Sequence, residues 1–184
     1  MFRVLIIFFI LNFNNLVLAE TKQKIISKLE QISNLSFNFK QEINSKSENG
    51  NCIIQYPKKI YCEYNNINKK ILVSNGKSLV IKYRNSGAYY RYPLKKTALN
   101  FLLDKNYLIK KIKKLEFRTI DNKYLNFKIF DNENEINIYF DKNNYNLIGW
   151  QTEDIYQNLV ITFISSIKIN SKIEKKLFML PKQN

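Results

Sequence analysis

The sequence predicts a mostly β (α+β) protein, in which an apolar lid covers a curved antiparallel sheet. Strand-like segments run from Leu35 to Leu94, a short apolar segment from Ala98 to Leu103 interrupts them, and strands resume up to the C-terminus. Apolar and polar residues alternate in these segments, as they do in strands with one buried face. Only four Gly and three Pro occur, so turns must use Asn, Asp and Lys-Asn pairs, which favours hairpins.

The N-terminus has the composition of an export signal. Arg3 precedes an apolar run from Val4 to Leu11, and Ala19 is a small residue at a position that a signal peptidase reads. The run is far shorter than the about 20 residues that span a bilayer, which disfavours the alternative of an uncleaved anchor. We expect residues 1–19 to be a signal peptide, cleaved after Ala19, and residues 20–184 to form one exported domain.

A helix is predicted next, and strands follow it. From Thr21 to Ser33, apolar residues such as Ile25 and Leu29 recur at helical spacing opposite lysines, so this helix must lie on something apolar. The strands that follow show alternation most clearly at three places, namely Leu35, Phe37 and Phe39, then Leu79, Ile81 and Tyr83, then Ile136, Ile138 and Phe140.

Cys52 and Cys62 lie on either side of the turn signal from Tyr56 to Lys59. A hairpin that turns there places both cysteines on the same face of the sheet, nearly opposite each other. In an oxidising compartment such a pair closes a disulfide when the Cα atoms come within about 7 Å. We therefore predict a Cys52–Cys62 disulfide, with two free, buried cysteines as the alternative. Metal binding by two lone cysteines is not expected.

The apolar interruption reads as a short second helix. Thr97 is placed as its N-cap, and Ala98, Leu99, Phe101, Leu102 and Leu103 make it apolar nearly all round. Such a helix is buried on more than one side, or it covers an apolar cavity. The residues alone leave both alternatives open.

The chain is strongly basic, with a net charge of +15. Twenty-six of the thirty basic residues are Lys, and they are scattered, which an A/T-rich genome explains without any ligand. Nucleic-acid binding is therefore not expected. Attraction to anionic head groups or to an acidic partner is the alternative, and its seat would be the densest cluster, formed by Lys110, Lys111, Lys113 and Lys114.

Catalysis is not predicted, and neither is a cofactor or a metal. The chain has no His, which removes the commonest general base and the commonest transition-metal ligand. It also lacks a phosphate-binding Gly-rich loop. The acidic groups that come close in sequence are read as solvated charges beside turns, because a catalytic pair needs one carboxyl in an apolar pocket; they are Glu133, Glu135 and Asp141, and Glu153 and Asp154.

Several segments, in order, resemble the periplasmic lipoprotein-carrier family, LolA. They are Leu35 to Gln41, Gly50 leading to Tyr56-Pro57, Ile71 to Leu79 around Asn75-Gly76, Pro93-Leu94 before Thr97 to Leu103, and Leu177 to Pro181, which resembles the closing strand of that family. The resemblance implies an unclosed antiparallel β-barrel of about eleven strands, with short helices as a lid over an apolar cavity. It also implies a periplasmic monomer that takes acylated lipoproteins from an inner-membrane ABC transporter to an outer-membrane receptor.

The resemblance assigns roles to particular residues. Leu99, Leu102 and Leu103 belong to the lid, and Tyr56 stands where other members carry an Arg that helps to keep the lid shut. A phenol brings no charge, so closure is expected to be weaker or to depend on another residue. Ala98 likewise stands where a Pro is common. The expected acyl-chain cavity is lined by Leu35, Phe37, Phe39, Ile54, Ile60, Leu79, Ile81, Ile136, Ile138 and Phe140.

Two other functions compete with that of a lipoprotein carrier. The same fold can serve as a lipid-binding or lipoprotein-sensing module with a different cargo. A basic nucleic-acid-binding protein is the third hypothesis, and the export signal and the scattered lysines argue against it.

Overall fold

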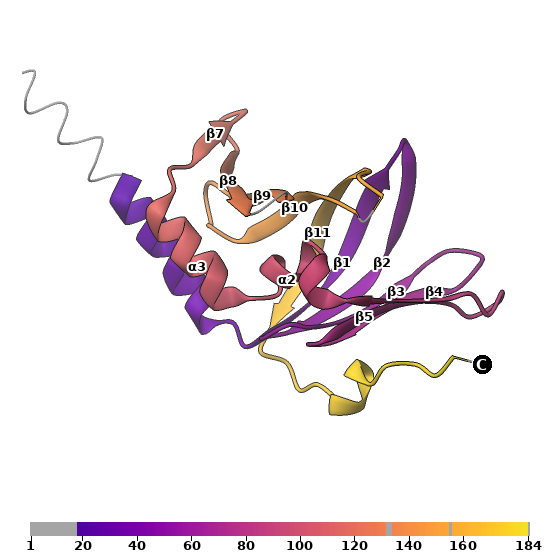
Figure 1. Cartoon of the computed structure of the whole chain (residues 1–184). Helices are drawn as coiled ribbons and strands as arrows, with labels where there is room; N and C mark the ends of the chain where they lie inside the picture. The colour runs from indigo at the N-terminus through magenta and orange to yellow at the C-terminus, as the bar shows by residue number, and fades with distance from the viewer. Residues whose placement is uncertain (1–17, 132–133, 155, 184) are drawn as a thin grey trace, which may run out of the picture.

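The protein is built round one antiparallel sheet of eleven strands (Figure 1). The computed structural model describes residues 18–131, 134–154 and 156–183. Of the predicted signal peptide, residues 1–17 lie outside the described residues. The strands are β1 (Asn34–Ile43), β2 (Lys46–Gln55), β3 (Lys59–Tyr64), β4 (Lys70–Asn75), β5 (Ser78–Tyr83), β6 (Tyr89–Pro93), β7 (Arg118–Ile120), β8 (Tyr124–Asp131), β9 (Asn134–Asp141), β10 (Leu147–Glu153) and β11 (Leu159–Ile169).

The order of the strands is that of two antiparallel meanders joined at one pair. Neighbours run from β6 through β5, β4, β3, β2 and β1 to β11, and then through β10, β9 and β8 to β7. The pairing of β1 with β11 joins the first and last strands of the chain. The sheet curves without closing, and its free edges are β6 and β7. The predicted mostly β class and the unclosed antiparallel sheet are therefore confirmed.

Period-two alternation explains why the strands bury one face. In the β8–β9 hairpin, Phe127 lies opposite Ile138 and Ile129 opposite Ile136, and all four side chains are fully buried. Each such side chain contributes about 1.5–3 kcal/mol on burial. These residues continue into the same core as the inward residues of β1.

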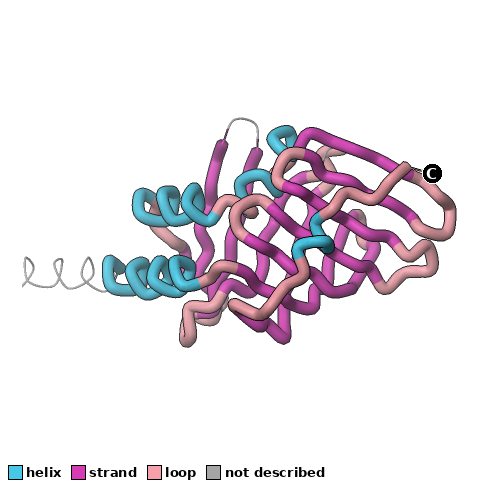
Figure 2. Tube along the Cα trace, turned by 90° about the horizontal axis from the view of Figure 1, so that it is seen from below, coloured by secondary structure: helices cyan, strands magenta, loops and turns pink. Residues whose placement is uncertain are grey.

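Two helices cover one end of the concave face. The first is described over residues 18–31, close to the predicted span of 21–33, and the second is α3 (Lys105–Lys114). They lie side by side in Figures 1 and 2. Ile25 and Ile112 are fully buried, and Leu29 and Leu108 nearly so. The helix α3 was not predicted, because its lysines outnumber the residues of its apolar stripe, which is formed by Leu108, Ile109 and Ile112.

A single segment joins the two free edges of the sheet. After β6 come the 3₁₀ helix η1 (Leu94–Lys96), the short helix α2 (Leu99–Leu102) and α3, which leads to β7. The predicted short helix is therefore present, but Thr97 is not its N-cap. The hydroxyl of Thr97 donates to the carbonyl of Leu94, at 2.8 Å, and so closes η1 instead.

The C-terminal residues do not form the closing strand that was expected. The last strand ends at Ile169, and η2 (Lys175–Phe178) follows against β3 and β4 (Figure 1). Phe178 is 3% exposed. Val73 and Val80, which alternate with the inward residues of β4 and β5, are also buried. Covering this second apolar face explains why the segment packs on the sheet instead of extending it.

No helix in the described residues is long and apolar enough to cross a membrane. The same residues contain no group of three or more Cys, Asp or Glu placed to hold a metal ion.

Candidate functional site

A cavity of about 300 Å³ lies between the concave face of the sheet and the segment that joins its edges. Strands from both meanders contribute to its wall, and Leu99 of α2 contributes from the lid side. The lining is predominantly apolar, with Phe39, Ile43, Cys52, Ile60, Cys62, Leu72, Leu79, Ile81, Ala98, Leu99, Trp150 and Val160. Such a lining suits an apolar ligand.

Four residues of the predicted acyl-chain set line this cavity. Phe39 reaches it from β1, Ile60 from β3, and Leu79 and Ile81 from β5. Of the predicted lid residues, Leu99 lines it as well. The alternation of the strands predicts that these side chains point inward, and the helices over the sheet determine which inward side chains line the cavity.

The other predicted lining residues fill the core instead. The helix over residues 18–31 and α3 lie on that part of the concave face, and their apolar side chains belong to the same buried cluster as the inward side chains. Leu102 and Leu103 are also core residues, 6% and 0% exposed, and not part of the cavity wall. The predicted lining positions of the sheet that lie in the core are Leu35, Phe37, Ile54, Ile136, Ile138 and Phe140, all at most 3% exposed.

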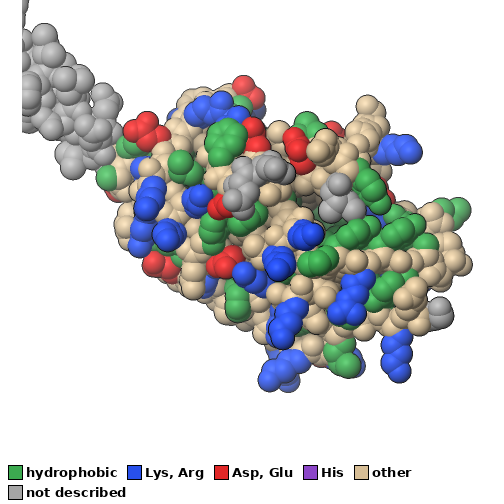
Figure 3. Space-filling view, in the orientation of Figure 1, with side chains coloured by type: hydrophobic (Ala, Val, Ile, Leu, Met, Phe, Trp, Pro, Cys, Tyr) green, Lys and Arg blue, Asp and Glu red, His purple; other side chains and the backbone are tan. Residues whose placement is uncertain are grey.

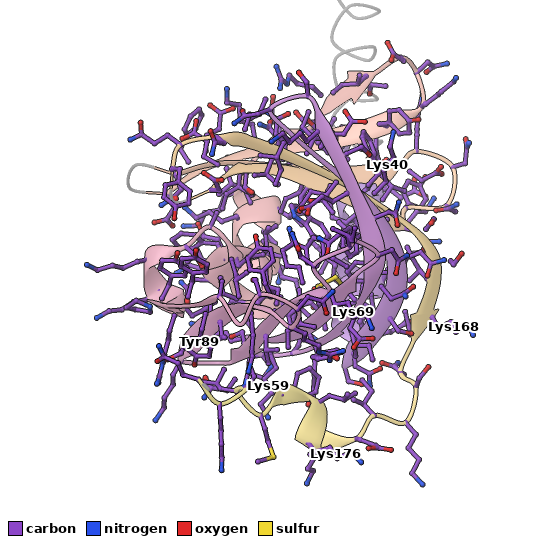
Figure 4. All side chains as sticks on the ribbon, turned by 90° about the vertical axis from the view of Figure 1, so that its right-hand side faces the viewer. Lys40, Lys59, Lys69, Tyr89, Lys168 and Lys176 are labelled. Atoms are coloured by element: carbon purple, nitrogen blue, oxygen red, sulfur yellow. A yellow bond between two sulfur atoms is a disulfide. The ribbon has the colours of Figure 1, made fainter. Side chains whose placement is uncertain are left out.

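A disulfide forms part of the cavity wall. Cys52 and Cys62 are direct partners in the β2–β3 register, with their Cα atoms 4.1 Å apart, and they are bonded. Figure 4 shows the bond within the curve of the sheet. The predicted pairing is confirmed, and the alternative of two free cysteines is wrong. A disulfide fits an exported protein, because oxidising compartments preserve such bonds.

A polar network interrupts the apolar wall. The ammonium of Lys70 pairs with Glu48 and lies 3.7 Å from the centroid of the Tyr64 ring. The hydroxyl of Tyr64 donates to Gln41, at 3.3 Å, and the amide of Gln41 donates to Thr162, at 3.0 Å. Burial lowers the pKa of Lys70, and the hydrogen bond with Glu48 opposes that shift. Burial also raises the pKa of Tyr64, which keeps the phenol neutral. Sequence reasoning missed this network, since its members come from five different strands.

The lid is fastened to the sheet at the β2–β3 turn. The backbone N–H of Lys58 donates to the carbonyl of Leu103 at 2.7 Å, and its ammonium lies 3.5 Å from the carboxylate of Asp104. Asp104 also caps α3, because its side chain accepts from the N–H of Tyr107 at 3.1 Å. These contacts hold the junction between α2 and α3 against the turn.

The predicted latch residue, Tyr56, lies beside this junction. Its N–H donates to the carbonyl of Ser33 at 3.0 Å, and its ring packs against the core. Burial raises the pKa of its phenol. Lys105 lies 6.0 Å from the centroid of this ring and donates to the carbonyl of Ile32 at 2.7 Å. The hydrogen bond and the ion pair from the turn to the lid come from Lys58, and a latch role for Tyr56 stays a prediction.

A hydrogen bond and an ion pair join α3 to β8. The phenol of Tyr107 donates to the carboxylate of Asp131, and the ammonium of Lys111 lies 3.3 Å from the same carboxylate. The hydrogen bond from Tyr107, followed by the bond and charge of Lys111, holds the pKa of Asp131 below its usual value, although burial acts in the opposite direction. Of the predicted lysine cluster, Lys111 therefore has a structural partner.

Tyrosines surround the mouth of the cavity. Tyr83 and Tyr92 line both the cavity and an adjoining outer hollow of about 460 Å³, as does Tyr156 from the β10–β11 turn. Tyr90 lines the hollow, and its ring meets that of Tyr83 edge to face at 6.4 Å. Burial, followed by a hydrogen bond with Tyr156, raises the pKa of Tyr92 to about 12. Figure 3 shows apolar side chains gathered on the face over the β4 and β5 end of the sheet, beside Lys and Arg.

Two of the carboxylates considered for catalysis, Glu153 and Asp154, line the cavity. Asp141 and Asp154 accept backbone N–H groups within their own turns. Hydrogen bonds from Lys128 and Asn137 keep the pKa of Glu135 low, whereas a general acid needs a raised one. Glu133 lies outside the described residues.

The fold and the cavity define a class of protein, the lidded antiparallel half-barrel with an apolar interior. The comparisons with known proteins agree with this class. The family model described as outer membrane lipoprotein carrier protein LolA matches residues 30–181. The chain belongs to this family. None of the curated proteins matches the sequence.

Solved structures with the same fold have little sequence in common with the chain. An uncharacterized conserved protein from Thermus thermophilus is 10% identical, with a TM-score of 0.50 over 87% of this chain and 94% of that one. A LolA superfamily protein from Nitrosomonas europaea is also 10% identical, with a TM-score of 0.46 over 86% and 97%. The matching chain of the MucA/MucB complex of Pseudomonas aeruginosa is 8% identical, with a TM-score of 0.47 over 89% of this chain and 60% of that one. The similarity to the Thermus thermophilus protein, with its TM-score of 0.50, shows the fold.

Proposed function

We propose that the protein is a carrier that shelters the acyl chains of lipoproteins in its cavity. The observation that carries the proposal is the predominantly apolar cavity, which is bounded by the concave sheet and by Leu99 of the lid segment between β6 and β7. The family and the disulfide support transport through the periplasm, between an inner-membrane ABC transporter and an outer-membrane receptor. The carrier needs no cofactor and no catalytic group, and it works as a monomer.

The energetics of acyl chains explain why such a carrier is needed. Each methylene moved from an apolar site to water costs about 0.8 kcal/mol, so a sixteen-carbon chain costs on the order of 12 kcal/mol. The cavity must offset much of this cost while still allowing release. A predominantly apolar wall supports both requirements, because its apolar part adds no directional bonds that would hold the cargo.

The size of the cavity implies that loading moves the lid. At about 300 Å³, the cavity is at the lower end of the range of about 300–1,000 Å³ that holds drug-sized ligands. We therefore expect loading of a whole acyl chain to move α2 away from the sheet. The contacts of Lys58 with Leu103 and Asp104 are those that such a movement must break.

A binding experiment tests the proposal. Leu99→Asp places a charge on the cavity wall, so we expect it to lower the affinity for a fluorescent long-chain fatty acid by more than tenfold, since burying an unpaired carboxylate is costly. The matched control is Ile67→Asp, at a residue that is 88% exposed. Circular dichroism of both variants checks that the sheet is intact. Equal affinity of Leu99→Asp and the wild-type protein contradicts the cavity role.

Release from membranes tests the cargo. Spheroplasts that hold a labelled lipoprotein are incubated with the purified protein, and the label in the supernatant is measured. The wild-type protein is expected to release lipoprotein, and Leu99→Asp is not. If the protein binds fatty acid but releases no lipoprotein, its cargo is another lipid.

A further inference from the structure

The edge strand β6 presents unused backbone groups next to the tyrosine-lined hollow. Hydrogen bonds of the β5–β6 pair flank the strand, from the N–H of Tyr83 to the carbonyl of Ala88 and from the N–H of Leu94 to the carbonyl of Lys77, both at 2.9 Å. In this register the backbone N–H and C=O groups of the even-numbered residues of β6 point toward β5. The N–H groups of Tyr89 and Arg91 therefore point away from the sheet.

Nothing in the described part of the chain uses these two N–H groups. The strand β6 ends the order of strands and pairs with β5 alone. Figure 4 places Tyr89 at the outer margin of the sheet. Among the residues of β6, Pro93 lacks an N–H, so the free donors are confined to the part of the strand that borders the hollow. An extended peptide can pair with such an edge by adding one strand.

The hollow beside the edge suits the side chains of such a peptide. Tyr90 and Tyr156 are 46% and 69% exposed, and Tyr83 and Tyr92 complete an aromatic wall. Tyrosine rings provide contact area at a small cost in side-chain entropy, and their hydroxyls can bond to polar groups. Asn68 and Ser86 add further polar groups to the hollow. This mixed surface differs from the predominantly apolar cavity behind it.

We propose that the hollow and the free edge of β6 bind the polypeptide that follows the acylated cysteine of the cargo, as an added strand. The proposal rests on the proposed function, since the acyl chains must occupy the cavity. The hollow shares Ile81, Tyr83, Tyr92 and Tyr156 with the cavity. The polypeptide of a lipoprotein whose chains lie inside can leave through this mouth, which brings its first residues to β6.

Two probes separate the contribution of the peptide from that of the acyl chains. One is a synthetic diacylated S-glycerylcysteine followed by a short Ser-Asn peptide, and the other is the same diacylated cysteine ending in an amide. The affinity of the full mature protein for each is measured by competition with a fluorescent fatty acid. We expect the wild-type protein to bind the peptide-bearing probe more tightly than the amide.

Substitutions at the edge test which group binds the peptide. Arg91→Pro and Arg91→Ala both remove the guanidinium that bonds to Ser78, but only the proline removes the free N–H. We expect Arg91→Pro to bind the peptide-bearing probe about 5-fold more weakly than Arg91→Ala, as for one lost hydrogen bond, with equal affinities for the amide. Tyr90→Ala, which leaves the backbone intact, is expected to show the same selective loss. The control is Thr119→Pro, on the other edge strand, β7.

The outcomes separate this proposal from the one on which it rests. Equal affinities of Arg91→Pro and Arg91→Ala for the peptide-bearing probe, together with no selective loss in Tyr90→Ala, overturn the β6 site and leave the carrier function standing. An equal loss in Thr119→Pro also overturns it. If the wild-type protein binds neither probe nor the fatty acid, the carrier function fails and the β6 site fails with it.

Discussion

Gly50 shows how one residue sets the spacing of the cavity wall. A Cβ at this position would lie 2.0 Å from the carbonyl oxygen of Glu63 and 2.9 Å from the ring of Phe39. The glycine thus lets the ring of Phe39 lie over β2, where it meets Tyr64 edge to face at 4.8 Å. The sequence alone indicated that Gly50 belongs to a family pattern, and the structure supplies the physical reason.

We predict that Gly50→Ala destabilises the protein. The added methyl group must displace the backbone of β3 as well as the ring of Phe39, which costs about 1–3 kcal/mol as in other overpacked cores. The free energy of unfolding in urea measures this cost. Asn51→Ala, at the exposed neighbouring residue, is the control and should change stability by less than about 0.5 kcal/mol. An equal effect of the two substitutions would rule out the steric explanation.

At the scale of elements, α3 couples the lid to the sheet. Asp104 caps this helix and pairs with Lys58, while Tyr107 and Lys111 bond to Asp131 at the end of β8. The start of α3 is therefore held by the β2–β3 turn, and the middle of α3 is held by β8. In the proposed carrier, the contacts near α2 are the ones that opening of the cavity must break, because no residue of α3 lines the cavity.

The two roles of Asp104 can be separated by two substitutions. Asp104→Ala removes both the cap and the ion pair, and we expect it to lower stability by about 1 kcal/mol. Asp104→Asn keeps an acceptor for the N–H of Tyr107 and loses only the charge, so its cost should be below about 0.5 kcal/mol, since the pair with Lys58 is partly exposed. Amide hydrogen exchange in α3 and thermal unfolding measure both effects. Similar losses in the two variants would mean that the ion pair, and not the cap, holds the junction.

The elements were predictable to the extent that their signals are local. The strands were found because alternation is visible in the sequence, and the disulfide was found because a turn signal stands midway between the two cysteines. By contrast, the division of the inward residues into cavity wall and core depends on where two helices lie over the sheet. That choice separates Phe39 from Phe37 although both belong to β1, and no pattern within the strand carries it. The tyrosine mouth was likewise missed, because Tyr156 and Tyr90 are far apart in the sequence.

At the scale of the whole molecule, the large positive net charge is the dominant electrostatic feature. The chain has 30 Lys and Arg against 15 Asp and Glu. Several of the described ion pairs are exposed, as for Lys24 with Glu20 and Lys176 with Glu174, and such pairs contribute little. Unbalanced positive charge therefore repels itself across the surface, and this repulsion opposes the compact state.

We accordingly predict that salt stabilises the protein. Between about 10 mM and 150 mM NaCl the screening length falls to about 8 Å, so the repulsion weakens more than the few exposed pairs do. A gain of about 1 kcal/mol would raise the midpoint of thermal unfolding by about 2–4 °C for a chain of this size. Sucrose at equal osmolarity serves as the control for effects that do not depend on charge. A midpoint that falls with salt would show that the ion pairs outweigh the repulsion.

The lid segment is covalently continuous with both free edges of the sheet, through β6 and β7. Because it is attached at both ends, the lid segment cannot open by rotating about a single hinge. Outward displacement of α2 pulls on both edges at once, so the width of the cavity and the curvature of the sheet change as a single coordinate. For the proposed carrier we expect the distance between β6 and β7 to change on loading, and a pair of spectroscopic labels on the two strands would measure it in solution.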